Sequence, residues 1–415
     1  MEYYQYREFC LCPCGGQLPE GAKSVEEPFS PLVFLVARNP LLSRGIFSIH
    51  TISELDEAEG INLLLPPPED GGKNDALIRF IKEHGATVAN TAFTRWFRVL
   101  EEGYHRKDQP LTLHIVGLGN VGGTTAMGLK LLGTDLKLIG IFDYDFNKCL
   151  RYEAELNQVL PVRDGEHLPP VVIPLKDEMF ACDALLFTAA QAVPEVGAES
   201  GQDVRMMQYQ ANRELLRPYA RRAREEGFCG CFFQISDPVD QLSRAVFLMS
   251  NQNEAGAFDW QGLLPEQVRG FGLGVMHARA IYSAERDRVG TEQLRCYGPH
   301  GRGLVIANAP GQDYRDDLSR HLTHSAETAN LEVRSYGYKP YIAPGLSSAA
   351  VSMLRALRGE WHDAAVPLGG VYFGCRSRMT AFGTEQQREQ IHPELLERLE
   401  ESDRQLKEFD ATWAD

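Results

Sequence analysis

The chain has 415 residues, of which 43% are hydrophobic and 24% are charged, so it is long enough for two or three globular domains. The formal net charge of −15 at pH 7, without a long run of Lys and Arg, argues against nucleic acid as a partner. No apolar stretch approaches the roughly 18 residues of a membrane-spanning helix, and the N-terminus, MEYYQYREFC, lacks the features of a secretory signal. We expect a cytoplasmic protein without a membrane partner, whose nine cysteines stay reduced.

Residues 1–108 form a leading region with mixed signals. Cys10, Cys12 and Cys14 stand in CLCPCGG, but a closed zinc site needs about four ligands and no nearby His or Cys pair completes one, so we expect no metal there. Residues 74–103, NDALIRFIKEHGATVANTAFTRWFRVLEEG, have helical spacing in places. They indicate an α/β appendage or an element for packing and oligomerisation.

A dinucleotide-binding pattern begins at Leu111, where LTLHIVGLGNVGGTTAMGLKLLG predicts a strand, a glycine turn and a helix. Gly117 allows the tight turn, Gly119 lets the backbone approach a pyrophosphate, and Gly122 lets the helix pack closely on the strand. The loop expected at the cofactor therefore consists of Gly117, Gly119, Asn120, Val121 and Gly122.

A second apolar run, LKLIGIF, is followed by Asp143, 21 residues after Gly122. An acid at this spacing binds the ribose hydroxyls of a dinucleotide, and it favours NAD over NADP because a carboxylate repels a 2′-phosphate. The alternative is that Asp143 or Asp145 only caps a turn.

Apolar runs in DALLFTAA and FCGCFFQISDPVD predict two further strands, and MMQYQANRELLRPYARRAREEG between them predicts a helix. This alternation indicates an α/β fold, a doubly wound parallel sheet with helices on its faces. Ligands bind at the carboxyl ends of such strands, where Thr188, Ala189 and Ala190 offer a flat backbone beside a nucleotide. Near the C-terminus, HPELLERLEESDRQLKEF predicts a charged helix that packs by its Leu face.

In order and spacing, these motifs resemble those of the lactate and malate dehydrogenase family, from about Leu111 to near the C-terminus. TAA is similar to the family's Thr-Ala-Gly segment, and SDPVD, which begins at Ser236, is similar to its Ser-Asn-Pro-Val-Asp segment. RGFGLGVMHAR aligns with the stretch that ends in the family's substrate-binding arginine, and YGPHGRG resembles the segment around its catalytic histidine. The resemblance implies a Rossmann domain that binds NAD, with Ser236 near the cofactor, an α+β substrate domain, and a homodimer or homotetramer.

By this resemblance His300 is the general acid/base that gives a proton to the substrate's carbonyl oxygen and removes it in the reverse direction. An imidazole suits this role because it titrates near neutral pH. Arg279 binds the substrate carboxylate through its planar guanidinium. Arg205, in QDVRMMQYQAN, matches the mobile-loop arginine that polarises the carbonyl when the loop closes; a solvated arginine at a helix start is the alternative.

Three positions depart from the family pattern. The aspartate that orients the family's histidine is Met276 here, whereas the asparagine of the Ser-Asn-Pro segment is Asp237. We hypothesise that Asp237 pairs with His300 or with a cationic group of the substrate. Lys339, in YGYKPYIAPG, falls near the substrate by the same comparison, where it binds an additional anionic group or lies in solvent. The loop AQAVPEVGAESGQDV has no clear equivalent of the residue that separates lactate from malate specificity.

The sequence thus predicts an N-terminal extension of unknown role at 1–108, an NAD-binding Rossmann domain at 109–264 and an α+β substrate domain at 265–415. The favoured function is hydride transfer between NAD and a small 2-hydroxy or 2-keto acid that carries a carboxylate. An amino-acid or imine dehydrogenase of the opine-like kind is an alternative that Asp237 keeps open. A catalytically silent NAD sensor and a scaffold protein that works through residues 1–108 are the others.

Overall fold

The computed structural model describes residues 1–69, 75–102, 110–191 and 204–412, and at residue 75 and residues 204–206 it describes the backbone alone. The α-helices are α1 (Asp75–His84), α2 (Trp96–Glu102), α3 (Asn120–Leu132), α4 (Phe146–Leu156), α5 (Val204–Glu225), α6 (Val239–Ser250), α7 (Leu273–Arg286), α8 (Asp316–Ser335), α9 (Ser352–Leu357) and α10 (Pro393–Thr412). Short 3₁₀ turns are η1 (Ile52–Leu55), η2 (Ile61–Leu64), η4 (Lys176–Glu178) and η5 (Pro265–Gln267), and a π-helix, η6 (Pro344–Val351), precedes α9.

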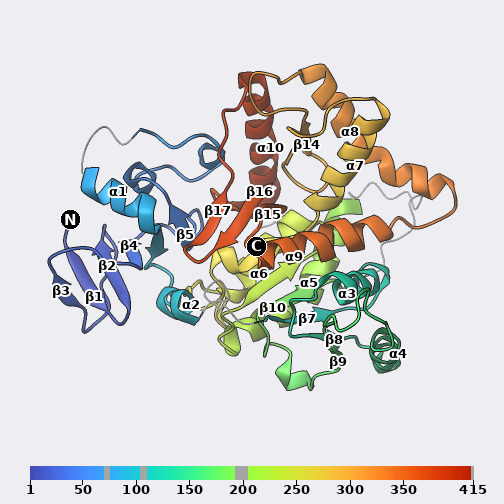
Figure 1. Cartoon of the computed structure of the whole chain (residues 1–415), viewed down its shortest axis with the longest axis horizontal. Helices are drawn as coiled ribbons and strands as arrows, with labels where there is room; N and C mark the ends of the chain where they lie inside the picture. The colour runs from blue at the N-terminus through green and yellow to red at the C-terminus, as the bar shows by residue number, and fades with distance from the viewer. Residues whose placement is uncertain (70–74, 103–109, 192–203, 413–415) are drawn as a thin grey trace.

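The strands are β1 (Tyr3–Tyr6), β2 (Phe9–Pro13), β3 (Lys23–Val25), β4 (Leu32–Val36), β5 (Ile46–Ile49), β6 (Ala86–Asn90), β7 (Thr112–Val116), β8 (Leu138–Phe142), β9 (Val171–Val172), β10 (Ala184–Phe187), β11 (Cys231–Gln234), β12 (Val268–Gly270), β13 (Arg295–Tyr297), β14 (Val305–Ala307), β15 (His362–Leu368), β16 (Val371–Thr380) and β17 (Gly383–Gln386). Within the described residues, 15 strands form one sheet in the order β3-β1-β2-β4-β6-β5-β17-β16-β15-β12-β11-β10-β7-β8-β9, and β13 pairs with β14. One sheet therefore connects the N-terminal, middle and C-terminal parts of the chain (Figure 1).

The middle of the sheet is a doubly wound nucleotide-binding unit. Strands β9, β8, β7, β10, β11 and β12 are neighbours in this order and all run parallel, which is the strand order of a Rossmann fold. This confirms the predicted α/β class. Strand β12 follows the domain boundary predicted at residue 264, yet it is the last parallel strand of the unit. The strand order reverses between β7 and β10, where such folds bind their ligands.

Apolar cores on both faces explain why these strands are almost wholly apolar. Side chains alternate across a strand, and along β10 Leu186 lies in one core whereas Leu185 and Phe187 lie in the other. The first core contains Ala126 and Leu129 of α3. The second contains Leu216 and Ala220 of α5 and Leu242 and Val246 of α6. Both faces are therefore covered by helices, as a parallel sheet requires.

The N-terminal extension continues the same sheet. Residues 74–103, predicted to be helical in places, contain α1 and α2 with the buried strand β6 between them, so the α/β interpretation of this segment holds for its described residues. Strands β2, β4 and β6 run parallel, and β5 joins the extension to the C-terminal strand β17 at Phe47 and Thr384. In Figure 1 the blue strand β5 lies beside the red β17.

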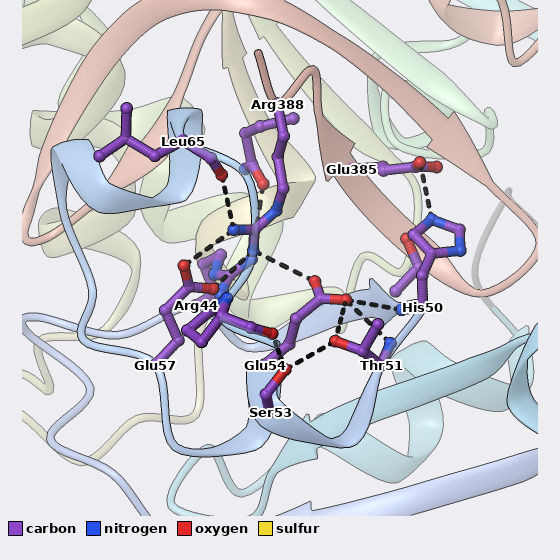
Figure 2. A network of polar contacts seen from close by, with 12 residues as sticks. Arg44, His50, Thr51, Ser53, Glu54, Glu57, Leu65, Glu385 and Arg388 are labelled. Carbon is purple, nitrogen blue, oxygen red and sulfur yellow. Dashed lines mark hydrogen bonds and ion pairs between the residues drawn. The ribbon is translucent and has the colours of Figure 1, made fainter. Parts of the chain in front are cut away.

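Buried ion pairs reinforce this junction. Arg388 bridges Glu54 at 3.1 Å and Glu57 at 2.6 Å, and the side chains of both glutamates are about 5% exposed. His50 of the extension contacts Glu385 of β17 at 2.8 Å. Figure 2 shows that these groups converge from the extension and from the segment that follows β17. The extension is therefore fixed to the C-terminal part of the chain.

The C-terminal part combines the antiparallel strands β15, β16 and β17 with the helix pair α7 and α8, which pack together. As predicted, α10 is a charged helix that buries a leucine face, formed by Leu395, Leu399 and Leu406. Among the described residues, we find no helix that is long and apolar enough to cross a membrane.

Candidate active site

The loop between β7 and α3 is shaped for close approach of a ligand to the backbone. Gly117 has a φ of 96°, a left-handed conformation that favours glycine. A Cβ atom on Gly122 would lie 2.0 Å from the carbonyl oxygen of Gly117, whereas a Cβ on Gly119 would enter open space. Asn120 is exposed at the start of α3, and Val121 follows it. The free backbone N–H groups and the positive end of the helix dipole fit a pyrophosphate here.

Asp143 lies beside this loop, directly after β8. Its carboxylate accepts a hydrogen bond from the backbone N–H of Leu118 at 2.7 Å, and both of its oxygens lie 3.3 Å from Nζ of Lys148. Oδ1 of Asp143 also accepts from the backbone N–H of Asp145 at 3.0 Å. The roughly four acceptor positions of the carboxylate are thus used within the chain, and a ribose hydroxyl would have to replace one of these contacts. Both aspartates cap backbone groups, as the alternative states: Asp143 accepts from the N–H of Asp145 in the turn after β8, and the side chain of Asp145 accepts from backbone N–H groups in the first turn of α4.

The facing loops, after β10 and β11, are tied to the glycine loop by hydroxyl groups. Thr188 donates to the carbonyl oxygen of Gly117 at 2.6 Å, and Ser236 donates to that of Ala189 at 2.7 Å. Ala189 is half-buried and Ala190 is exposed. The hydroxyls predicted to lie near the cofactor thus hold these loops together.

Asn212, fully buried on α5, links the same loops. Its Oδ1 accepts from the backbone N–H of Gln191 at 2.9 Å, and its Nδ2 donates to the carbonyl oxygen of Asp237 at 2.7 Å. One amide therefore positions the ends of two parallel strands against each other.

A cavity of about 740 Å³ opens at the carboxyl ends of these strands, a size typical of ligand sites. Residues of α7, α8 and η6 line it, together with the loops around Asp237 and His300. The lining residues are Val121, Gln208, Ile235, Asp237, Pro238, Phe271, Gly272, Val275, Met276, Arg279, His300, Gly301, Arg302, Glu327, Asn330, Arg334, Pro340, Pro344 and Ser348. Three of the five residues predicted to act on substrate, Asp237, Arg279 and His300, thus share one cavity with Val121 of the glycine loop.

Arg279 extends from α7 into this cavity. Its Nη1 donates to the carbonyl oxygen of Ala326 on α8 at 3.3 Å and lies 3.4 Å from Sδ of Met276. Burial lowers the pKa of Arg279, an effect that Asp237 opposes; a guanidinium nevertheless stays protonated in proteins. No residue in the described ranges forms an ion pair with it, so it is available for an anion.

The loop of His300 is held tightly. Gly298 and Gly301 have φ values of 79° and 139°, which other residues rarely adopt. The backbone N–H of His300 donates to the buried carboxylate of Asp240 at 2.8 Å. A Cβ on Gly272 would lie 2.6 Å from Cβ of His300, so a glycine is needed opposite the histidine. These constraints fix where the imidazole enters the cavity.

The imidazole of His300 pairs with Asp237, whose Oδ1 lies 3.0 Å from Nδ1. An ionised carboxylate can only accept, so Nδ1 carries the proton and Nε2 is left for a substrate. Burial disfavours the charged ring, but the carboxylates of Asp237 and Asp240 outweigh burial and the repulsion from Arg279, and the pKa of His300 is raised. The imidazole of this pair therefore binds and releases its proton at a higher pH than an ordinary histidine does.

Met276 is buried on the cavity wall and supplies no carboxylate. The next residue, His277, pairs with Asp363 of β15 at 2.6 Å and is not among the residues that line the cavity. Of the two partners considered for Asp237, the structure provides His300. The side chain of Asp237 is 50% exposed, so a substrate group can reach it as well.

Two predicted residues are not placed in the cavity. Lys339 is exposed to solvent, which was the alternative considered for it. Its neighbour Pro340 lines the cavity instead. Arg205 belongs to the first turn of α5, but its side chain lies outside the described residues.

Sequence reasoning missed several residues that shape the site. Ser348 of η6 is buried, accepts from the backbone N–H of Val275 at 2.8 Å and donates to the carbonyl oxygen of Gly272, so it caps the N-terminus of α7. Such π-helical turns recur at functional sites. Nothing in the sequence pairs Ser348 with α7. The cavity face of α8 had a weak signal, because Glu327, Asn330 and Arg334 recur at helical spacing.

No group of three or more His, Cys, Asp or Glu side chains suited to a metal ion occurs in the described part of the chain. Cys10 and Cys12 lie on β2 within the apolar core of the extension, and Cys14 is half-buried beside them. Burial raises the pKa of Cys10, whereas the hydrogen bond with Cys12 lowers the pKa of Cys14.

Solved dehydrogenases share this fold at low sequence identity. A lactate dehydrogenase from a Medee basin deep-sea metagenome library matches with a TM-score of 0.58 and 17% identity, over 73% of this chain and 98% of its own. A malate dehydrogenase from Archaeoglobus fulgidus, in complex with NADH, matches with 0.57 and 17%, over 72% and 97%. A minor L-lactate dehydrogenase from Enterococcus mundtii matches with 0.58 and 19%, over 74% and 99%. The chain therefore contains nearly the whole fold of these enzymes. No protein-family model and no curated protein sequence matches it.

Proposed function

We propose that the chain is an NAD-dependent oxidoreductase that transfers a hydride between the nicotinamide and C2 of a carboxylate-bearing 2-hydroxy or 2-keto acid. The observation that supports this most is one cavity that joins Arg279, which has no ion-pair partner in the described part of the chain, to a histidine–carboxylate pair, His300 and Asp237. Val121 of the glycine loop lines the same cavity, which brings a dinucleotide bound at that loop to the substrate.

The residues at the glycine loop fit a dinucleotide. The open space at Gly119 and the start of α3 accept the pyrophosphate, and Asp143 accepts from the adenosine ribose. The carboxylate of Asp143 disfavours a 2′-phosphate, so NAD is the expected cofactor in preference to NADP. When bound, its nicotinamide supplies or accepts the hydride.

The substrate is bound and polarised by the chain's own side chains. The guanidinium of Arg279 holds the substrate carboxylate with two parallel hydrogen bonds, which orients C2 in the cavity. His300 donates the proton on Nε2 to the carbonyl oxygen in reduction and removes it in oxidation, while Asp237 stabilises the imidazolium through Nδ1. Arg205, in the first turn of α5, is proposed to polarise the carbonyl. A homodimer or homotetramer is proposed from the sequence resemblance alone.

The test is oxidation of NADH, and in parallel of NADPH, across a panel of 2-keto acids with and without ammonia or primary amines. The proposal expects NADH oxidation by a keto acid alone. If the chain binds NADH but oxidises it with none of the keto acids, the proposal is wrong and an NAD sensor is favoured.

Reductive amination is the second candidate, because the half-exposed carboxylate of Asp237 lines the cavity and would attract an ammonium or iminium group. Strict dependence of turnover on an amine would establish this candidate over the first. Turnover that is unchanged by amines would exclude it.

A further inference from the structure

Three cysteines gather at strand β2, which lies between β1 and β4 in the N-terminal part of the sheet (Figure 1). Side chains alternate across a strand, so Cys10 and Cys12 point to the same face, where both are fully buried in the apolar core of the extension. Cys14 follows the strand directly, packs against the same core and is half-buried. One thiol that solvent can reach is therefore placed next to thiols that it cannot reach.

The backbone around Cys14 is held by the neighbouring strand and by two glycines. Strand β2 ends at Pro13, and the backbone N–H groups of Cys14 and Gly16 both donate to the carbonyl oxygen of Leu35 on β4, at 2.7 and 3.0 Å. Gly15 has a φ of 92°, and a Cβ atom on Gly16 would lie 2.6 Å from the backbone carbonyl carbon of Leu35. The chain therefore turns away just after Cys14, while Cys14 itself stays in register with the sheet.

The thiol groups of Cys12 and Cys14 are joined by a hydrogen bond. This hydrogen bond lowers the pKa of Cys14, although burial and the charge of Asp56 oppose the shift. The same hydrogen bond, together with burial, raises the pKa of Cys12. Cys14 is therefore the member of the pair that ionises, and Cys12 keeps its proton and donates it. The thiol of Cys10 instead contacts the backbone of Phe29.

These features suit reaction with a peroxide. The thiolate is the nucleophile, and the susceptibility of a cysteine to oxidation follows its thiolate character and its exposure. Cys14 has both properties, whereas Cys229 is also half-buried but has a pKa that burial raises. The sulfenic acid that a peroxide produces condenses with a neighbouring thiol to a disulfide. Cys12 is that neighbour, and it needs no solvent access because the second step is intramolecular.

The spacing of the two residues permits this bond. Residues of a strand rise by about 3.3 Å each, so Cα atoms two positions apart are separated by about 6.6 Å. Disulfides occur at Cα separations of about 4.4 to 6.8 Å. Because the pair lies near the upper end of this range, its disulfide is strained, and strained disulfides are easily reduced. The geometry therefore favours a reversible bond over a permanent structural bridge.

We propose that Cys14 and Cys12 form a reversible oxidation site for peroxides. First, the Cys14 thiolate attacks one oxygen of hydrogen peroxide; the O–O bond breaks, the leaving hydroxide takes up a proton, and Cys14 becomes a sulfenic acid. Next, the sulfur of Cys12 bonds to the sulfur of Cys14; the S–O bond breaks, and the hydroxyl group leaves as water with the proton of Cys12. The two thiols lose two electrons in total, and the peroxide is reduced to two waters. This inference does not depend on the proposed function.

The test treats the full reduced chain with a small excess of hydrogen peroxide, blocks the remaining thiols with iodoacetamide under denaturing conditions, and digests the chain with trypsin. Cleavage after Arg7 and Lys23 gives one peptide, residues 8–23, that contains the three cysteines. The proteins are the wild type, Cys12→Ala, Cys14→Ala and the control Cys10→Ala, which removes an equally buried thiol from the same strand. A parallel set contains dimedone, which labels sulfenic acids.

We expect the wild-type peptide to lose two hydrogens, to carry iodoacetamide on Cys10 alone, and to be restored by a reducing agent. Cys14 should be consumed about tenfold faster than Cys229, and this difference should vanish in the chain unfolded by guanidinium. Cys10→Ala should form the same disulfide. Cys14→Ala should form none, and Cys12→Ala should accumulate dimedone on Cys14, because the sulfenic acid then has no thiol partner.

The comparison of Cys14 with Cys229 is made within the wild-type chain, so it holds even if a variant fails to fold. Consumption of Cys14 no faster than that of Cys229 in the folded chain would overturn the inference. A disulfide that includes Cys10, or a folded Cys12→Ala protein in which dimedone does not label Cys14, would overturn it as well.

Discussion

The imidazole of His300 is paired with the carboxylate of Asp237, Nδ1 to Oδ1, at 3.0 Å. The helix position that supplies this carboxylate in the lactate and malate dehydrogenase pattern is occupied by Met276, whose sulfur contacts Arg279. In this chain the carboxylate beside His300 comes from the loop after β11 and not from α7. The same imidazole can be held from either wall of the cavity.

Asp237→Asn should shift the pH dependence of keto-acid reduction to lower pH. Asp237 raises the pKa of His300, and reduction requires the protonated ring, so removal of the charge makes activity decline at a lower pH as the pH rises. The measurement is kcat/KM against pH. In the double variant Asp237→Asn/Met276→Asp, the pH at which kcat/KM declines should return toward that of the wild type, provided that both proteins unfold at a similar temperature. If kcat/KM declines at the same pH in Asp237→Asn as in the wild type, this carboxylate does not raise the pKa of His300.

Asp143→Asn should weaken discrimination between NADH and NADPH. The amide can still accept from the N–H of Leu118, but the repulsion of a 2′-phosphate is lost while Lys148 remains nearby. We expect the preference for NADH to fall about tenfold or more, measured as the ratio of dissociation constants. In Asp143→Asn/Lys148→Met the gain in NADPH affinity should shrink. An unchanged ratio in Asp143→Asn would place the ribose elsewhere.

Arg388→Met should destabilise the fold by about 3 to 5 kcal/mol, because it leaves the buried carboxylates of Glu54 and Glu57 without their cation. Chemical denaturation gives the free energy of unfolding. The control Arg320→Met breaks an exposed pair with Asp316 and should cost at most about 0.5 kcal/mol. Equal effects of the two variants would mean that the ion pairs in Figure 2 do not fix the extension.

Glu266→Gln should flatten the dependence of stability on pH. Burial raises the pKa of Glu266 to about 7, although backbone N–H groups of Gly45 and Ile46 donate to it. Between about pH 4.5 and 7 the folded carboxyl retains a proton that the unfolded chain releases, so stability falls as pH rises, by on the order of 3 kcal/mol in total. The unfolding free energies of wild type and variant, compared at both ends of this range, test the effect. Parallel curves would contradict it.

The parts of the fold that follow local rules could be predicted from the sequence. The glycine spacing around Gly117 and the apolar runs of β7, β8, β10 and β11 predicted the nucleotide-binding unit, because a parallel strand buried on both faces has a continuous apolar sequence. Strand β6, inside residues 74–103, was not foreseen, since five buried residues between two helices give no periodic signal of their own. Strand β12 has three residues and was equally hidden.

The site was only partly predictable for a related reason. His300 and Arg279 stand in recognisable segments, so a resemblance could point to them. Asn212 and Ser348 act through backbone groups of loops distant in sequence, and such contacts leave no pattern in their own neighbourhood. Lys339 was placed near the substrate by alignment alone, whereas in the structure Arg334, one turn earlier on α8, lines the cavity.

The most direct test of the central claim is transfer of deuterium from NADH that carries deuterium at both hydrogens of nicotinamide C4 to C2 of a 2-hydroxy acid, followed by mass spectrometry of the product. We predict label at C2 with the wild type, and a rate lower by about 10²- to 10⁴-fold in His300→Gln, whose NADH affinity should be unchanged. Label-free product, or no product from any keto acid with a chain that binds NADH, would contradict the account.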